Sequence, residues 1–357
     1  MNTAISNTKS LNTASLNTDS MHTGCLNDEN QKAELLKLAD IDGADGYCIA
    51  NCVFYVLESH LCKAVAGMPG FEPFCVSHGV PVSELLSNPY ASHSHPSGQS
   101  SSDEAMGEAD VVPPFYICFS ENPMEAEAKC QYTFQSDGVD SEFASIGTGY
   151  ALQMKHENGM QMQLWSDTSH RLIYIHGDLL PQMLRFALWI AFGVMTVNYH
   201  RIPIHGSCIM HQESAYLFLG ESGTGKSTHT RLWREYISGS SLLNDDSPII
   251  ACETDGMFIY GSPWSGKTPC YKPLKLSLGG CVRLSQAPFN KIQRLSPLKA
   301  YAALHPSCPP EFAYDEALYA GISQTLDGLL SSVPVYHLAC LPDEAAALLS
   351  FTSLTNQ

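Results

Sequence analysis

The residues of this sequence best suited to chemistry form a glycine-rich loop at positions 220–227. They read Gly-Glu-Ser-Gly-Thr-Gly-Lys-Ser, which matches the phosphate-binding (Walker A) pattern G-x-x-x-x-G-K-[ST] at every fixed position. The glycines let the backbone fold tightly and point successive N–H groups at phosphate oxygens. Lys226 has the reach to contact the β- and γ-phosphates, and Ser227 offers a hydroxyl to magnesium. The loop therefore predicts binding of ATP with Mg through Gly220, Glu221, Ser222, Gly223, Thr224, Gly225, Lys226, Ser227 and Thr228.

The segments on either side of the loop support this interpretation. Residues 215–219 form a short apolar run that is typical of a buried strand, and residues 227–237 carry apolar side chains at helical spacing. A strand, a glycine-rich loop and a helix are the context in which the pattern binds phosphate.

Two adjacent aspartates supply the acidic groups that such a site needs. Asp245 and Asp246 end an apolar run and lie nineteen and twenty residues beyond Lys226. A strand that delivers a carboxylate beside the loop is the Walker-B arrangement, in which the acid holds the metal directly or through water. The second acid is then free to take the proton of an acceptor hydroxyl. A turn or a helix cap is the alternative for an Asp-Asp pair before Ser247 and Pro248.

Three segments, in this order, resemble the catalytic domain of HPr kinase/phosphorylase and its relatives, a family that shares its nucleotide site with ATP-dependent phosphoenolpyruvate carboxykinase. They are Ile204-His205-Gly206-Ser207, residues 217–227 and Asn244-Asp245-Asp246, and the resemblance covers residues 178 to about 351. It implies a layered α/β domain and a kinase that uses ATP and Mg. By this resemblance His205 lies near the γ-phosphate, Asp245 is the base, and Asp246 helps Ser227 to hold the metal, so His205, Lys226 and Asp245 are the catalytic residues.

Two segments depart from HPr kinase itself. Thr228 stands where HPr kinases usually carry glutamate, and residues 260–268 resemble a motif of uncharacterised HPr-kinase-like proteins. The departures argue against HPr as the acceptor, and the resemblance implies another hydroxyl, such as a serine of a peptide, a carrier protein or a free small molecule. The chain is also much shorter than a carboxykinase.

The charge of the chain is distributed unevenly. The formal net charge is −17, yet there is no Asp or Glu between Gly256 and Pro310, where seven Lys and Arg residues fall. A local positive field beside the loop would suit polyphosphate and an anionic acceptor, although a solvated basic face is the plain alternative. Within this segment Lys267, Trp264 and Arg283 are the candidate substrate contacts. Lys267 follows flexible Gly266, and Trp264 would wall the acceptor pocket unless it belongs to the core.

Composition argues against several classes of partner. A charge of −17 without a basic domain leaves no surface suited to nucleic acid. The longest apolar stretch, residues 186–197, is too short to span a membrane and predicts a buried helix capped by Asp178, with Pro181 in its first turn.

The thirteen cysteines lack C-x-x-C pairs, so we expect reduced thiols, in the cytoplasm. Cys48 and Cys52 could share a helix face, but small buried apolar residues are the favoured interpretation. The sequence does not decide whether the protein forms a homo-oligomer.

We expect the chain to be divided into three parts. Residues 1–32 carry a five-residue polar repeat and should be disordered. Residues 33–176 should form a smaller, mainly antiparallel β domain with a helix at 31–39 and a disordered insertion at about 79–113. Residues 177–357 should form the nucleotide-binding domain, which makes the chain α+β overall.

Further elements are predicted from turn and cap signals. The expected strands are 150–155, 160–165, 172–175, 249–253, 257–260 and 333–338, and the expected helices are 297–304 with Ser296 as cap, 315–330 and 342–349.

Other functions fit the same residues. A regulatory nucleotide-binding protein or an accessory protein of peptide maturation would hydrolyse ATP without a dedicated acceptor. A kinase would form a phosphorylated product from labelled ATP, whereas these functions would turn over ATP without such a product.

Overall fold

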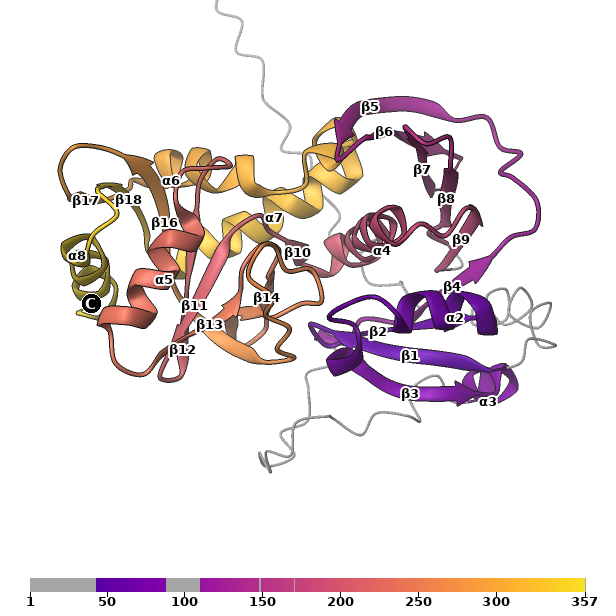
Figure 1. The fold of residues 1–357 in the computed structure, drawn as a ribbon, viewed down its shortest axis with the longest axis horizontal. Coiled ribbons are helices and arrows are strands. Elements are labelled where there is room, and N and C mark those ends of the chain that lie inside the picture. The colour runs from indigo at the N-terminus through magenta and orange to yellow at the C-terminus, as the bar shows by residue number, and fades with distance from the viewer. Residues whose placement is uncertain (1–42, 88–109, 148, 170, 357) are drawn as a thin grey trace, which may run out of the picture.

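The computed structural model describes residues 43–87, 110–147, 149–169 and 171–356 of the chain. They form a mixed α/β fold with two large sheets and flanking helices (Figure 1). The helix expected at 31–39 and the repeat at 1–32 lie outside these residues.

The first sheet has nine strands in the order β3-β1-β2-β4-β9-β8-β7-β6-β5. Neighbouring strands are antiparallel except for β2 with β4 and β4 with β9, so the expectation of a mainly antiparallel sheet is confirmed. The strands are β1 Ala44–Ile49, β2 Cys52–Leu57, β3 Cys75–Val80, β4 Phe115–Phe119, β5 Lys129–Ser136, β6 Val139–Ile146, β7 Gly149–His156, β8 Gln161–Asp167 and β9 Leu172–Gly177. Helices α2 Ser59–Ala66 and α3 Val82–Ser87 and the 3₁₀ turn η2 Glu72–Phe74 accompany them.

The second sheet carries the phosphate-binding loop. Its strand order is β10-β14-β15-β16-β12-β11-β13, and β18 pairs with both β16 and β17. The strands are β10 Arg201–Pro203, β11 Ser207–His211, β12 Ser214–Leu219, β13 Ser240–Asn244, β14 Ile249–Glu253, β15 Gly256–Tyr260, β16 Lys275–Gln286, β17 Lys291–Arg294 and β18 Val335–Cys340. The helices are α5 Lys226–Tyr236, α6 Pro297–Leu304, α7 Glu316–Ser332 and α8 Glu344–Thr355, with 3₁₀ turns η4 Val197–Tyr199, η5 His305–Ser307 and η6 Pro310–Tyr314. The predicted strands and helices of this half are confirmed within a few residues.

Helix α4 (Pro181–Thr196) lies between the two sheets. In Figure 1 it sits within the curve of β5 to β9, and it contacts β7, β8 and β10. The prediction that Pro181 lies in the first turn is confirmed, since the helix begins at this residue, where the missing N–H of proline costs nothing. The predicted cap is wrong: Leu180 precedes the helix, and the Asp178 carboxylate instead accepts a hydrogen bond from the Gln161 backbone N–H at 2.8 Å.

Other local expectations are corrected. Cys48 and Cys52 lie on β1 and β2, on either side of a tight turn, rather than on a helix. Part of the predicted insertion is ordered, since β3 reaches Val80 and α3 follows, while residues 88–109 lie outside the described part. Ser296 precedes α6 but makes no capping bond with its side chain.

One apolar core runs through both sheets. Phe54 and Phe143 of the first sheet belong to the same buried cluster as Ile190 of α4 and Leu217 of the second. The expected division at residues 176/177 stays a prediction. No helix within the described ranges is long and apolar enough to cross a membrane.

Candidate functional site

The phosphate-binding loop connects β12 to α5, and glycine is required at its bends. Gly225 adopts φ 105° immediately before the helix, in the left-handed region that side chains disfavour. A Cβ on Gly220 would lie 2.5 Å from the Thr224 hydroxyl oxygen. The loop is closed by the Thr224 hydroxyl, which donates to the Glu221 carbonyl at 2.7 Å. The backbone therefore makes the tight concavity that the sequence pattern predicts.

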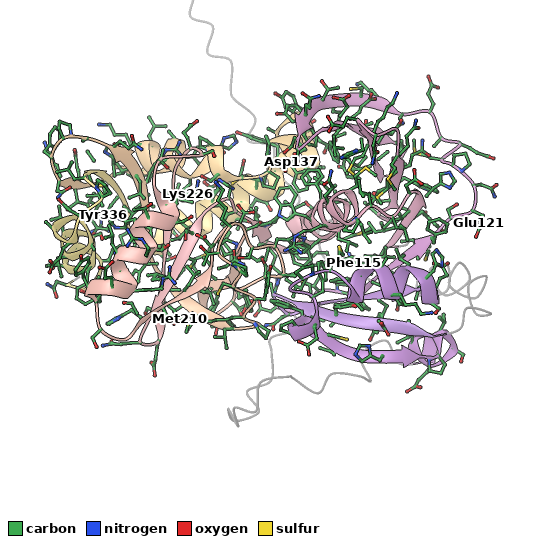
Figure 2. The ribbon with its side chains drawn as sticks, in the orientation of Figure 1. Phe115, Glu121, Asp137, Met210, Lys226 and Tyr336 are labelled. Carbon is green, nitrogen blue, oxygen red and sulfur yellow. The ribbon has the colours of Figure 1, made fainter. Side chains whose placement is uncertain are left out.

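Lys226 opens helix α5 and contacts two separate parts of the chain (Figure 2). Its Nζ lies 2.8 Å from the Gly220 carbonyl oxygen and 2.9 Å from Nε2 of His205. An ammonium group only donates, so Nε2 of His205 accepts and the ring proton belongs on Nδ1. That Nδ1 lies 3.4 Å from Oδ1 of Asp246. Burial lowers the pKa of Lys226, while the charges of Asp246, Asp245 and Glu221 oppose that shift.

The turn after β13 brings the two aspartates to the loop. The Asn244 side chain holds this turn, since its Oδ1 accepts from the backbone N–H groups of Asp246 and Ser247 at 2.9 Å each. Its amide nitrogen donates to the Trp264 carbonyl at 3.2 Å. The Asp246 carbonyl in turn accepts from Gly206 at 2.9 Å. The segments around residues 205, 226 and 245 are thus fixed against one another.

The two carboxylates differ in their surroundings. Asp245 is 6 % exposed, its Oδ1 accepts a hydrogen bond from the Ser207 hydroxyl at 2.6 Å, and its Oδ2 is buried without a partner among the described residues. The side chains of Asp246 and His205 are 43 % and 50 % exposed. One acid therefore belongs to the protein interior and the other faces solvent beside the loop.

The three candidate substrate contacts lie in different environments. Arg283 on β16 forms an ion pair with Glu221 of the loop at 3.2 Å and donates to the Ala303 carbonyl of α6 at 3.1 Å. Lys267 is exposed in the segment that follows Gly266, whose N–H lies 3.3 Å from the Asp245 carbonyl oxygen. Trp264 is 4 % exposed and packs against Phe71 and Phe192. It is a core residue and lines no pocket among the described cavities.

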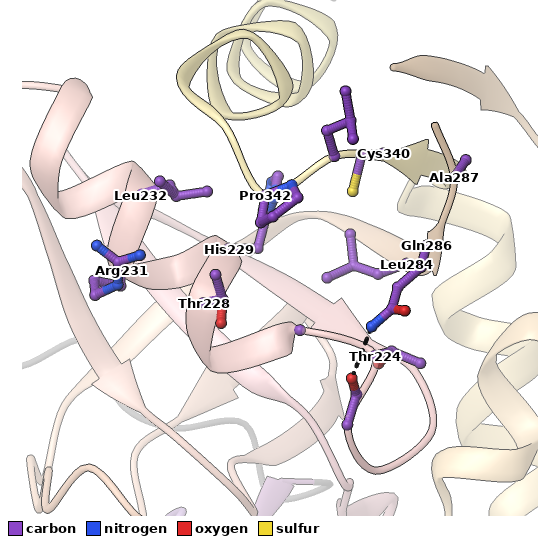
Figure 3. Close-up of a pocket in the computed structure, with 13 residues that line it drawn as sticks. Thr224, Thr228, His229, Arg231, Leu232, Leu284, Gln286, Ala287, Cys340 and Pro342 are labelled. Atoms are coloured by element: carbon purple, nitrogen blue, oxygen red, sulfur yellow. Dashed lines mark hydrogen bonds between the residues drawn. The ribbon is translucent and has the colours of Figure 1, made fainter. Parts of the chain in front are cut away.

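A pocket of about 800 Å³ borders the loop, and neither Asp245 nor Asp246 lines it (Figure 3). The loop and α5 contribute seven of the residues in its wall: Gly223, Thr224, Gly225, Thr228, His229, Arg231 and Leu232. The remaining wall comes from Leu284, Gln286, Ala287, Cys340, Leu341 and Pro342. The Gln286 amide donates to the Gly223 carbonyl at 3.1 Å across the mouth of this pocket.

Sequence reasoning missed four residues of this region. Asn244 and Ser207 lie within the segments that carry the family resemblance, but no role was assigned to them, and their polar side chains beside apolar runs were the available signal. Thr230 and Gln286 gave none, because their contacts join residues 23 and 63 positions apart in the chain.

The oxygen donors beside the loop suit magnesium, which is bound through one or two carboxylates together with phosphates and water. Among the described residues no group of three or more His, Cys, Asp or Glu side chains is placed to hold a metal by itself. No protein-family model matches the chain, and no curated protein matches it.

Proposed function

We propose that this chain is an ATP- and Mg-dependent kinase that transfers the γ-phosphoryl group to a hydroxyl, such as a serine of a peptide, a carrier protein or a free small molecule. The observation that carries the proposal is the convergence of three distant segments, in which the Lys226 ammonium contacts His205 and His205 approaches Asp246. A glycine-rich turn alone would not need such neighbours. The second sheet and its helices are then a P-loop domain of the HPr kinase type.

The roles follow from charge and position. The N–H groups of the loop and Lys226 bind the phosphates, and Lys226 offsets the charge that develops during transfer. Magnesium, held by Ser227 and Asp246, would neutralise the β- and γ-phosphate oxygens. Asp245 orients the acceptor hydroxyl and takes its proton. The exposed Lys267 lies on a segment next to this corner and is suited to an anionic acceptor.

The pocket beside the loop is suited to the rest of the nucleotide. A ligand with its phosphates on the loop would extend past Thr228 toward Leu284 and Pro342, which offer the apolar surface that a base stacks on. The Gln286 amide and the Arg231 guanidinium add polar groups at the rim.

Transfer of label tests the proposal. The protein is incubated with γ-labelled ATP and a cell extract that is then separated into protein and small-molecule fractions. We expect label in one fraction, and Lys226→Ala should lower it at least about 100-fold, because an electrostatic contact to the transferred group is lost. Lys291→Ala, on the exposed strand β17, is the matched control and should retain full transfer.

Two results would contradict the kinase. ATP turnover that gives only free phosphate favours the regulatory or accessory function, and label that persists in Lys226→Ala comes from another enzyme. The described cysteines are free, which suits a reducing compartment such as the cytoplasm.

A further inference from the structure

Two buried hydroxyl groups lie in a series next to the Asp245 carboxylate. Ser207 begins β11 and Thr230 lies on α5, and each is 1 % exposed. The Ser207 oxygen lies 2.6 Å from Oδ1 of Asp245 and 3.0 Å from the Thr230 oxygen. The Thr230 oxygen lies 3.2 Å from the carbonyl oxygen of Ser227, one turn earlier in the helix. A continuous hydrogen-bonded path therefore joins the helix that carries the phosphate-binding loop to Asp245.

The chemistry of the groups sets the direction of this path. An ionised carboxylate only accepts, and a serine hydroxyl has one proton, so Ser207 donates to Asp245. The contact between the two hydroxyls is then attractive only if Thr230 donates to Ser207, and its one proton is then directed to Ser207 rather than to the Ser227 carbonyl, the other acceptor within reach. Protons thus point from Thr230 to Ser207 and from Ser207 to Oδ1.

This arrangement leaves Oδ2 as the oxygen of Asp245 without a partner. A buried carboxylate oxygen without a donor is costly, and an acceptor hydroxyl whose binding uncovers Oδ2 would supply the missing donor. We propose that Ser207 and Thr230 are positioning residues that fix Asp245 through Oδ1 and leave Oδ2 to take the proton of the acceptor hydroxyl. The inference rests on the proposed kinase function, and it adds two residues that couple the base to helix α5.

Single and double variants test the path. Thr230→Val has the same shape without the hydroxyl, and Ser207→Ala removes the donor itself. With MgATP and the labelled acceptor fraction, Ser207→Ala should lower kcat about tenfold or more and Thr230→Val by a smaller factor, since part of a base contribution of 10²–10⁴ is lost. KM for ATP and the affinity for a fluorescent ATP analogue should stay within about twofold, because neither hydroxyl touches the loop N–H groups.

Three further readouts separate positioning from packing. The double variant should be no slower than Ser207→Ala, because both hydroxyls act through one bond to Asp245. Ser207→Thr, which keeps the hydroxyl, should recover most of kcat. Thr325→Val is the control, since Thr325 is also buried and bonds only to the Gly321 carbonyl of α7.

The outcomes distinguish the two proposals. A wild-type protein that binds and turns over no MgATP overturns both. If the wild type is active and kcat is unchanged in Ser207→Ala and Thr230→Val, the positioning path alone is overturned. The same holds if the reductions in kcat of the two single variants multiply in the double variant, or if the variants change KM for ATP instead of kcat. If Ser207→Ala fails to fold, as judged by its melting temperature, the isosteric Thr230→Val decides.

Discussion

Gly225 illustrates how much a single residue contributes to this site. Its φ of 105° places it in the left-handed region, and a Cβ there would meet only the Cβ of Thr228, at 4.0 Å. Space is therefore available, and the cost of a side chain is conformational. The same residue immediately precedes the first turn of α5, so the conformation that a side chain would strain also sets the start of the helix.

Gly225→Ala should lower the free energy of unfolding by about 1–2 kcal/mol, the cost of a left-handed conformation for a residue with a Cβ. ATP affinity should fall as well, because the helix start can relieve the strain only by moving its N–H groups. Urea unfolding and titration with a fluorescent ATP analogue measure both. Ser222→Ala in the same exposed loop should change the free energy of unfolding by less than about 0.5 kcal/mol. Unaltered unfolding and binding in Gly225→Ala would show that the loop tolerates the side chain.

At the scale of elements, local signals predicted most of the fold. The turn at residues 157–159 predicted the β7–β8 hairpin, and Asp315 both precedes α7 and accepts hydrogen bonds from its first N–H groups. The predictions that failed depend on distant partners. Asp178 bonds to β8 and not to α4, and Trp264 packs under α4, which the sequence around neither residue reveals. The loop and the aspartates follow from motifs, whereas Ser207 needs the fold to reach Asp245.

Turn η6 packs against strand β5 of the first sheet and contains a buried acid. Glu311 is 4 % exposed, and its Oε2 has no partner among the described side chains. Burial raises its pKa to about 7. The folded protein therefore holds this proton more tightly than the unfolded chain, whose glutamates have pKa values near 4.5. The contribution of Glu311 to the free energy of unfolding is therefore fully present below pH 4.5 and is lost as the pH rises through 7.

Between pH 4.5 and pH 8 this loss should reach about 3 kcal/mol, at 1.36 kcal/mol for each pH unit between the two pKa values. Glu311→Gln keeps the shape without the titration, so it should match the wild type at pH 4.5 and unfold at higher urea at pH 8. Urea titrations across this range measure the effect, with the exposed Asp327→Asn of α7 as control. A wild type whose stability does not fall over this interval contradicts a buried, protonated Glu311.

On the scale of the whole molecule, a buried ion pair within the second sheet is linked by hydrogen bonds to a turn of the first sheet. Arg201 of β10 and Glu253 of β14 are 2 % and 4 % exposed, and their charged atoms lie 3.3 Å apart. The Arg201 guanidinium also donates to the Ala50 carbonyl, in the turn between β1 and β2, at 3.1 Å. Asn51 in the same turn donates to the Tyr260 hydroxyl at 3.0 Å. The turn of one sheet thus completes the hydrogen bonding of the other.

Arg201→Met should lower the free energy of unfolding by about 3–5 kcal/mol, because it leaves Glu253 buried with Lys275 as its remaining cation. Arg231→Met is the matched control: its pair with Glu235 is exposed and should contribute less than about 1 kcal/mol. One buried cluster contains residues of both sheets, while Trp165 packs on a small cluster of the first sheet and Trp233 belongs to a cluster around α5. Because the shared cluster joins the two sheets, urea unfolding followed by these two tryptophans should give coincident transitions. Separate transitions would show two independent folding units.

The hydrogen bond from Arg201 to the Ala50 carbonyl limits where the chain can be divided into fragments. A fragment that starts at residue 177 would contain the loop, both aspartates and the pocket, yet its Arg201 would lack the Ala50 acceptor that lies 151 residues earlier. Exchange of the first sheet for one from another protein would fail for the same reason unless the β1–β2 turn were carried over with it. For chimeras and truncations, the smallest portable unit is the half that carries the glycine-rich loop together with that turn.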